Sequence, residues 1–238
     1  MAVTFKQLLN RALRITGEDT ISSAASTVTD ANQLLIAEVA NEIKEEVEAA
    51  HNWRALLQTV TVAFSAGETS NSITEANERS RVYRSMDTRH CYPIPLVYDI
   101  TDSTSPVHLK EMDLATLLHK RTMDTSSGND PWCFALDNTS GDTLKVQLYP
   151  TPTDSRTIQL TLVIPQARLD AENSTDLATN IKVPVRPITL GLVRYILEER
   201  GEELGINSQY SEEKEFKALQ DAISLDLAES GGNDMMVV

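Results

Sequence analysis

The residues that could perform chemistry are few, and their spacing does not favour it. The four histidines are His51, His90, His108 and His119, and none belongs to an HExxH motif, a His-x-His pair or a Cys/His set with metal-ligand spacing. His90 directly precedes Cys91, but neighbouring residues on a strand point to opposite faces, which disfavours a nucleophile or ligand pair. The chain also lacks a phosphate-binding Gly-rich loop and a GxSxG nucleophile motif.

Acidic and aromatic residues leave three weaker possibilities. Asp99 and Asp102 could contribute to a calcium site, although the remaining ligand spacing of a calcium loop is missing. Trp53 and Trp132 are either platforms for a ligand or, more commonly, core anchors where a helix or loop meets a sheet. The 35 acidic residues could include a carboxylate pair for glycosidic chemistry, but their abundance gives no single pair weight.

The composition indicates a globular protein and argues against one kind of partner. Of the 238 residues, 41% are hydrophobic, no apolar run approaches the roughly 20 residues of a membrane span, and the N-terminus shows no secretory pattern. We therefore expect synthesis in the cytoplasm, with Cys91 and Cys133 as packed thiols. The net charge of −14 is opposite to that of a protein that grips DNA through its phosphates. A negative charge is suited to a channel surface along which DNA moves without adhering, or it serves solubility alone.

The element that organises the chain is a long helix predicted over residues 30–56. Thr29 and Asp30 are good N-cap residues, and no glycine or proline follows until well past Trp53. Its predicted apolar face consists of Leu34, Leu35, Val39, Ile43, Val47 and Ala50. The predicted solvated faces carry Glu38, Glu42, Lys44, Glu45, Glu46 and Glu48. An alternative role for this acidic surface is the wall of an electronegative channel.

Further helices are predicted at both ends of the chain. Thr4 and Gln7 fit a capping box that begins a helix ended by Gly17. Near the other end, apolar periodicity predicts helices over residues 188–197 and 208–229, the first preceded by Pro184 and Pro187. Because all these helices carry apolar stripes, we expect them to form a four-helix bundle.

Between these ends the period changes to that of strands. Alternating segments over residues 57–64, 81–86, 91–100, 132–136, 143–149 and 157–164 predict an antiparallel meander. Residues 68–80 read as an exposed loop, and residues 109–121 as an inserted helix. The predicted class is α+β: a helical bundle of residues 1–57 and 182–230 beside an antiparallel β-sandwich or partly open barrel of residues 58–181. Residues 231–238 are expected to be a flexible tail.

Four segments resemble the head-to-tail adaptor family of tailed bacteriophages, also called connectors or tail tubular protein A-like proteins. Residues 5–18 resemble the family's opening helix, which ends in Gly-Glu, and residues 30–53 followed by 59–62 resemble its long helix, tryptophan and first strand. Residues 129–135 with 144–152 resemble a strand pair that ends in Pro-x-Pro, and residues 182–184 the start of the closing helix. The segments follow the family's order along nearly the whole chain, although residues 90–121 do not align.

The resemblance implies a structural virion protein of the neck, without catalytic residues, metal or cofactor. Family members form a ring, typically of twelve copies, that closes the neck beneath the portal protein and carries the tail nozzle or tail-tube protein. Genomic DNA then passes through the channel without specific binding, and no membrane is involved. The predicted portal-docking residues are Gly231, Gly232, Met235, Met236, Val237 and Val238. The predicted subunit-interface or lumen residues are Glu38, Glu42, Glu45 and Glu46.

Two other classes stay open from the sequence. One is a β-sandwich module that binds carbohydrate by stacking sugars on Trp53, Trp132 and exposed tyrosines. The other is a hydrolase that uses a carboxylate pair, or His90 with Cys91, and it requires several titratable groups in one pocket.

Overall fold

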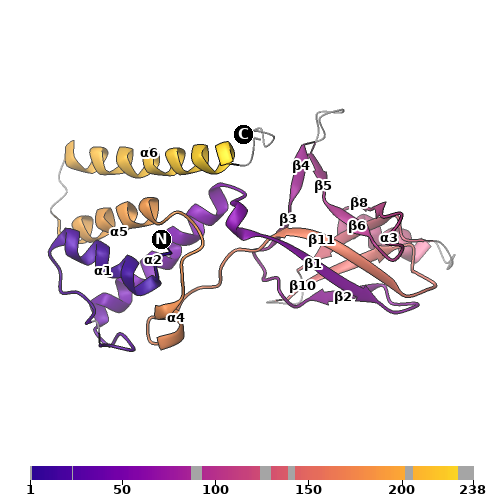
Figure 1. Ribbon diagram of the computed structural model, residues 1–238, viewed down its shortest axis with the longest axis horizontal. Coiled ribbons are helices and arrows are strands. Elements are labelled where there is room, and N and C mark those ends of the chain that lie inside the picture. Colours follow the sequence, from indigo (N-terminus) through magenta and orange to yellow (C-terminus); the bar gives the residue numbers. More distant parts are fainter. Residues whose placement is uncertain are drawn as a thin grey trace. The chain divides into compact units, whose positions relative to one another are not determined.

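The computed structural model describes residues 2–22, 24–86, 93–123, 130–138, 143–201 and 206–229. They form two compact units, drawn in Figure 1. The helical unit contains the described residues up to Ala55 and from Gln166 onward, and the β unit extends from Leu56 to Pro165. The predicted α+β class is confirmed, and no sheet of the described strands closes into a barrel.

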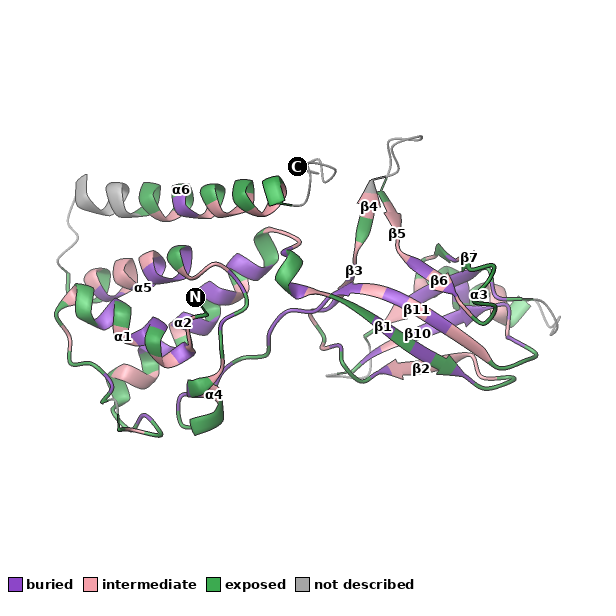
Figure 2. Ribbon diagram, in the orientation of Figure 1, coloured by how far each residue is buried: buried purple, intermediate pink, exposed green. Residues whose placement is uncertain are grey.

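The helical unit consists of α1 (Phe5–Thr16), α2 (Ala31–Ala50), α5 (Val185–Glu199) and α6 (Ile206–Glu229), with the short α4 (Ser174–Ala178). Helix α5 is central, because it contacts α1, α2 and α6. Figure 1 shows α5 between α1 and α6. Figure 2 shows that α6 is the most exposed of the four long helices. No helix in the described ranges is both long and apolar enough to cross a membrane.

Helix α1 forms as its local signals predict. The Thr4 hydroxyl accepts from the Gln7 N–H while the Gln7 side chain accepts from the Thr4 N–H, which completes the capping box. Gly17 ends the helix with φ +76°, a left-handed conformation that glycine adopts without strain. The five predicted apolar residues are all buried: Phe5, Leu8, Leu9, Ala12 and Leu13.

Helix α2 is shorter than predicted, because it ends at Ala50 and a separate 3₁₀ turn follows at Arg54–Leu56. The indole of Trp53 folds back, and its Nε1 donates to the Val47 carbonyl at 2.6 Å. That carbonyl belongs to the last turn, where helical carbonyls lack partners within the helix. Trp53 thus caps the end of α2 and is only 2% exposed.

The predicted apolar face of α2 is wrong in part. Leu35 and Ala50 are exposed, whereas Lys44 and Glu48, predicted on the solvated side, are buried. The residues that α2 buries are Ile36, Ala37, Ala40, Asn41, Ile43, Lys44, Val47 and Glu48. The buried face of α2 is therefore rotated toward polar residues, three of which are Asn41, Lys44 and Glu48.

The β unit contains two main sheets. The first has the order β1 (Leu57–Phe64), β11 (Arg156–Val163), β6 (Val97–Asp99) and β7 (Val107–His108), with β3 (Arg81–Val82) also pairing β11. The second has the order β2 (Ser70–Ile73), β10 (Leu144–Tyr149), β9 (Cys133–Asp137) and β8 (Lys110–Glu111). A two-stranded ribbon joins β4 (Arg84–Met86) to β5 (Pro93–Pro95).

The inner faces of the two main sheets form one apolar core. Val60, Val62 and Phe64 of the first sheet share a buried cluster with Val146 and Leu148 of the second. The other face of the second sheet is covered by α3 (Leu114–Met123), whose Leu117 packs with Cys133, Ala135 and Tyr149. The centre of the second sheet, in β9 and β10, is therefore covered on both faces.

Several strand predictions need correction. Strands β9 and β10 pair as expected, but β11 crosses to the other sheet and pairs β1 from Leu57↔Val163 to Phe64↔Arg156, so there is no simple meander. The segment 81–86 is split between two sheets, and the polar segment 68–80 contains β2. Strand β8 runs parallel to β9.

The inserted helix begins at Leu114, later than predicted, because Leu109 is fully buried in the core between the sheets. The segment from residue 166 to 181, expected in the β domain, belongs instead to the helical unit.

Candidate assembly surfaces

The predicted portal-docking residues Gly231, Gly232, Met235, Met236, Val237 and Val238 lie outside the described residues, as do His90 and Cys91. The predicted interface glutamates are all described. They belong to α2, and each has some exposed surface.

The acidic face of α2 gathers around one arginine. The guanidinium of Arg168 lies 3.2 Å from a carboxylate oxygen of Glu45 and 3.9 Å from oxygens of Glu38 and Glu42. All four side chains are exposed to a substantial degree, so these ion pairs add little to the stability of the fold. Three carboxylates share one cation, which leaves this face negative. Glu46 lies apart from this cluster and lines a groove.

This groove, which we name the α6 groove, lies between α2, α5 and α6 and has a volume of about 670 Å³. Its apolar lining includes Ile43, Val47, Leu219 and Phe216, and Phe216 is 60% exposed. The groove also carries the carboxylates of Glu46, Glu212, Glu213 and Glu215 and the guanidinium of Arg194. It is thus an apolar trough with an excess of negative charge.

Glu215 and Arg194 face each other inside the α6 groove. Arg194 Nη1 lies 3.4 Å from Glu215 Oε2, an ion pair that does not meet hydrogen-bond geometry, and Oε2 has no hydrogen-bond partner among the described residues. Burial raises the pKa of the Glu215 carboxyl, and Glu46, Glu212 and Glu198 add to the rise while Arg194 opposes it. The wall of the groove therefore contains a carboxylate oxygen that accepts no hydrogen bond from the described residues.

Close packing at Gly191 positions that carboxylate. A Cβ at Gly191 would lie 2.8 Å from Glu215 Oε1 and 3.1 Å from two side-chain atoms of Ile43. Any larger residue at this position would require the side chains of Glu215 and Ile43 to shift.

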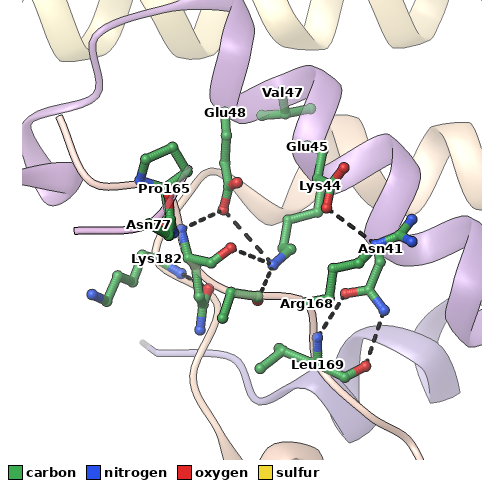
Figure 3. Close-up of polar contacts among 12 residues, drawn as sticks. Asn41, Lys44, Glu45, Val47, Glu48, Asn77, Pro165, Arg168, Leu169 and Lys182 are labelled. Carbon is green, nitrogen blue, oxygen red and sulfur yellow. Dashed lines mark hydrogen bonds and ion pairs between the residues drawn. The ribbon is translucent and has the colours of Figure 1, made fainter. Parts of the chain in front are cut away.

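Beside the acidic face, a buried polar cluster fastens α2 to the segment that follows β11 (Figure 3). The Lys44 ammonium donates to the backbone carbonyls of Ala167 at 2.6 Å and Gln166 at 3.1 Å, and its Nζ lies 3.9 Å from Glu48 Oε1. Glu48 in turn accepts from the Gln166 N–H at 3.2 Å. Lys44 is 0% exposed, and its charge is thus compensated by three oxygens. We call this group the Lys44 brace.

Asn41 extends the same attachment one turn earlier. Its Nδ2 donates to the Leu169 carbonyl at 2.9 Å, and its Oδ1 accepts from the Leu169 N–H at 3.0 Å. Both hydrogen-bonding groups of one backbone residue are satisfied by one side chain, as in a strand pair. Sequence reasoning missed this cluster; the only signal was Asn41 between apolar positions 40 and 43 of the helix.

A basic surface lies on the outer side of α1. This helix contains Lys6, Arg11 and Arg14 and no acidic residue. Arg11, Arg14 and Ile15 are exposed, Ile15 by 58%, and no described residue pairs with either guanidinium. We call these three residues the α1 outer face. Its charge is opposite to that of the protein as a whole.

The remaining candidates for chemistry do not converge on a common site. His51 Nε2 lies 3.0 Å from Asp226 Oδ2, and His108 Nε2 lies 2.7 Å from the Pro95 carbonyl. The Asp102 carboxylate accepts from Thr104, and these hydrogen bonds lower its pKa. In the parts of the chain that the structure describes, no three His, Cys, Asp or Glu side chains are grouped to hold a metal.

The two tryptophans do not form a sugar platform. Trp53 is buried as the cap of α2. Trp132 is 42% exposed, but Tyr149 packs edge-on against its ring and Lys120 Nζ lies 5.1 Å from the ring centroid. The carbohydrate-binding alternative is therefore not favoured.

Comparison with known families gives a match that covers nearly the whole chain. Residues 3–234 match the family model described as SU10 adaptor protein. The match includes both the helical unit and the β unit. No sequence among curated proteins matches the chain.

Proposed function

The chain belongs to the SU10 adaptor family, a family of phage head-tail adaptors, and from this premise we propose that its copies form a ring beneath the portal protein. The family assigns a structural role in the virion, at the junction of head and tail. In our proposal the ring has twelve copies, closes the neck after packaging and carries the tail nozzle or tail-tube protein. Genomic DNA passes through its channel, and the protein is made in the host cytoplasm.

The observation that carries this proposal is the family match along residues 3–234. The surfaces of the helical unit support it. A structural adaptor needs binding surfaces in place of a reactive pocket, and this unit has an acidic face, the α6 groove and the α1 outer face. Phe216 and Ile15 are apolar and exposed, and their burial by a partner would stabilise a complex.

For the portal contact, we propose the C-terminal residues Gly231, Gly232, Met235, Met236, Val237 and Val238. The two glycines allow the chain to bend, and the four apolar residues give it an anchor for another protein. The acidic residues Glu38, Glu42, Glu45 and Glu46 are proposed to face a subunit border or the channel. There, negative charge disfavours adhesion of the DNA phosphates.

The experiment is to mix the full chain with the purified portal ring of the same phage and to measure the mass of the product. We expect a complex with several adaptor copies per portal ring. Deletion of residues 231–238 should abolish this complex while circular dichroism and tryptophan fluorescence stay those of the intact chain. A deletion variant that still binds would refute the tail assignment. An intact chain that never binds the portal would refute the proposed function.

A further inference from the structure

Among the side chains that the structure describes, none fills the α6 groove. Phe216, which lines it, is 60% exposed. A partner that covers this side chain removes apolar surface from water, which is favourable. The groove is therefore a docking surface, and its charge indicates what it accepts.

Four carboxylates and one guanidinium line the groove, so the complementary partner carries positive charge beside an apolar residue. Glu212 and Glu213 of this lining are exposed, so their carboxylates are open to the planar donors of an arginine from a partner. The partner is thus expected to present arginine next to an aliphatic side chain.

The α1 outer face has this composition. Arg11, Arg14 and Ile15 are exposed together on one side of a helix that has no acidic residue. Spacings of three and four residues place them along one helical stripe, opposite to Leu9 and Leu13, which are buried. A stripe of this kind fits lengthwise into a trough between helices.

A chain cannot fill its own groove in this way. Helix α5 contacts both α1 and α6 and lies between them (Figure 1). The α1 outer face is the exposed side of α1, whereas the α6 groove is lined by α2, α5 and α6, so the two surfaces are separate. Two separate, complementary surfaces of one molecule give a head-to-tail contact that repeats from copy to copy.

We propose that the α1 outer face of each copy docks in the α6 groove of the next copy. Ile15 then packs against Phe216 and Leu219, and Arg11 and Arg14 pair with groove carboxylates that include Glu212 and Glu213. This inference rests on the proposed ring and names the surfaces that join its subunits.

The test uses two charge reversals in the full chain. The first, Arg11→Glu with Arg14→Glu, makes the α1 outer face acidic. The second, Glu212→Arg with Glu213→Arg, makes the groove basic. All four side chains are exposed, so both variants should fold with unchanged circular dichroism. The matched control is Lys182→Glu with Arg186→Glu, which reverses two exposed charges elsewhere on the helical unit.

Either variant alone places like charges in every subunit contact, and we expect adaptor–adaptor association on the portal ring to weaken by about 100-fold or more. An equimolar mixture should recover association, because alternation of the two variants pairs opposite charges at every contact. Native mass spectrometry of the portal complexes counts the copies and shows whether the variants alternate. The control variant should assemble as the unchanged chain does.

Two outcomes would overturn the proposal. One is assembly of each variant alone at the unchanged level. The other is loss of assembly that the mixture does not recover, which would assign the groove to a basic segment of the portal or tail. In both cases portal binding by the unchanged chain would still support the proposed function. Absence of any complex with the unchanged chain would count against the function itself.

Discussion

Replacement of Lys44 by methionine should destabilise the helical unit strongly. The side chain keeps its length, so the change leaves little cavity. It removes the ammonium that lies 2.6 Å from the Ala167 carbonyl and 3.1 Å from the Gln166 carbonyl. It also leaves Glu48, which is 1% exposed, without the cation at 3.9 Å.

The magnitude follows from the burial of this group. Removal of one partner of a buried ion pair costs about 3–5 kcal/mol, because the remaining charge stays out of water without compensation. We therefore expect Lys44→Met to lower the free energy of unfolding of the helical unit by about 3–5 kcal/mol. Glu48→Gln removes the charge and keeps an acceptor for the Gln166 N–H. In the double variant the combined loss should be smaller than the sum of the single losses by about 1–3 kcal/mol.

The assay is urea unfolding followed by Trp53 fluorescence in a Trp132→Phe background. The chain has two tryptophans, so this background leaves one reporter, buried in the helical unit. Lys217→Met, at an exposed position on α6, is the matched control and should change stability by less than about 0.5 kcal/mol. A Lys44→Met loss below about 1 kcal/mol, or additive effects in the double variant, would refute the view of the brace as a coupled buried pair.

Three further predictions concern other buried polar groups. Asn41→Leu leaves both backbone groups of Leu169 unpaired. In the same fluorescence assay the free energy of unfolding should fall by about 2–4 kcal/mol. A near-neutral result would contradict a stabilising role for these two hydrogen bonds. Arg121 donates from α3 to the Gln147 side chain at 3.0 Å and to a β10 carbonyl at 2.7 Å, so Arg121→Lys should lower β-unit stability by about 1–2 kcal/mol in hydrogen exchange. Glu215 has a raised pKa in the folded protein, so its contribution to stability is present below its ordinary pKa and is lost as pH rises through the raised value. The free energy of unfolding of Glu215→Gln should therefore rise relative to that of the unchanged chain as pH increases. A difference between the two that does not change with pH would refute this.

The sequence predicts helices well where their signals are local. The capping box at Thr4 and Gln7 and the stop at Gly17 act within one turn of the helix, and α1 forms as these residues predict. Strand β1 is found for a similar reason, because its alternation from Leu57 to Phe64 is read from consecutive residues. Such signals do not depend on where the chain goes next.

The sequence fails where a side chain has a distant partner. Lys44 and Glu48 look like an exposed i,i+4 pair, but the carbonyls that bind Lys44 come 122 and 123 residues later. The assignment of residues 166–181 to the helical unit is missed for the same reason, because their contacts with α2 are with residues more than 100 positions away in the sequence. Strand β2 is not predicted because its sequence, Ser-Asn-Ser-Ile, lacks the apolar alternation of a strand, and it forms through its pairing with β10.

The candidate surfaces were likewise predictable only in part. The acidic residues of α2 are visible in the sequence, but their separation into a cluster around Arg168 and a groove residue, Glu46, depends on how the chain folds. A groove between three helices has no linear pattern, because its lining comes from positions 43 to 219.

The net charge of −14 by itself suits a surface that repels DNA, and it would disfavour close association of identical copies by mutual repulsion. The distribution of charge removes that difficulty. Helix α1 has three basic residues and no acidic one, whereas the α6 groove has four carboxylates and one arginine. Copies that meet through these two surfaces bring opposite charges together while the acidic face of Glu38, Glu42 and Glu45 stays free. A chain with this asymmetry can attract its neighbours and still repel DNA, which a chain with evenly spread acidity cannot do.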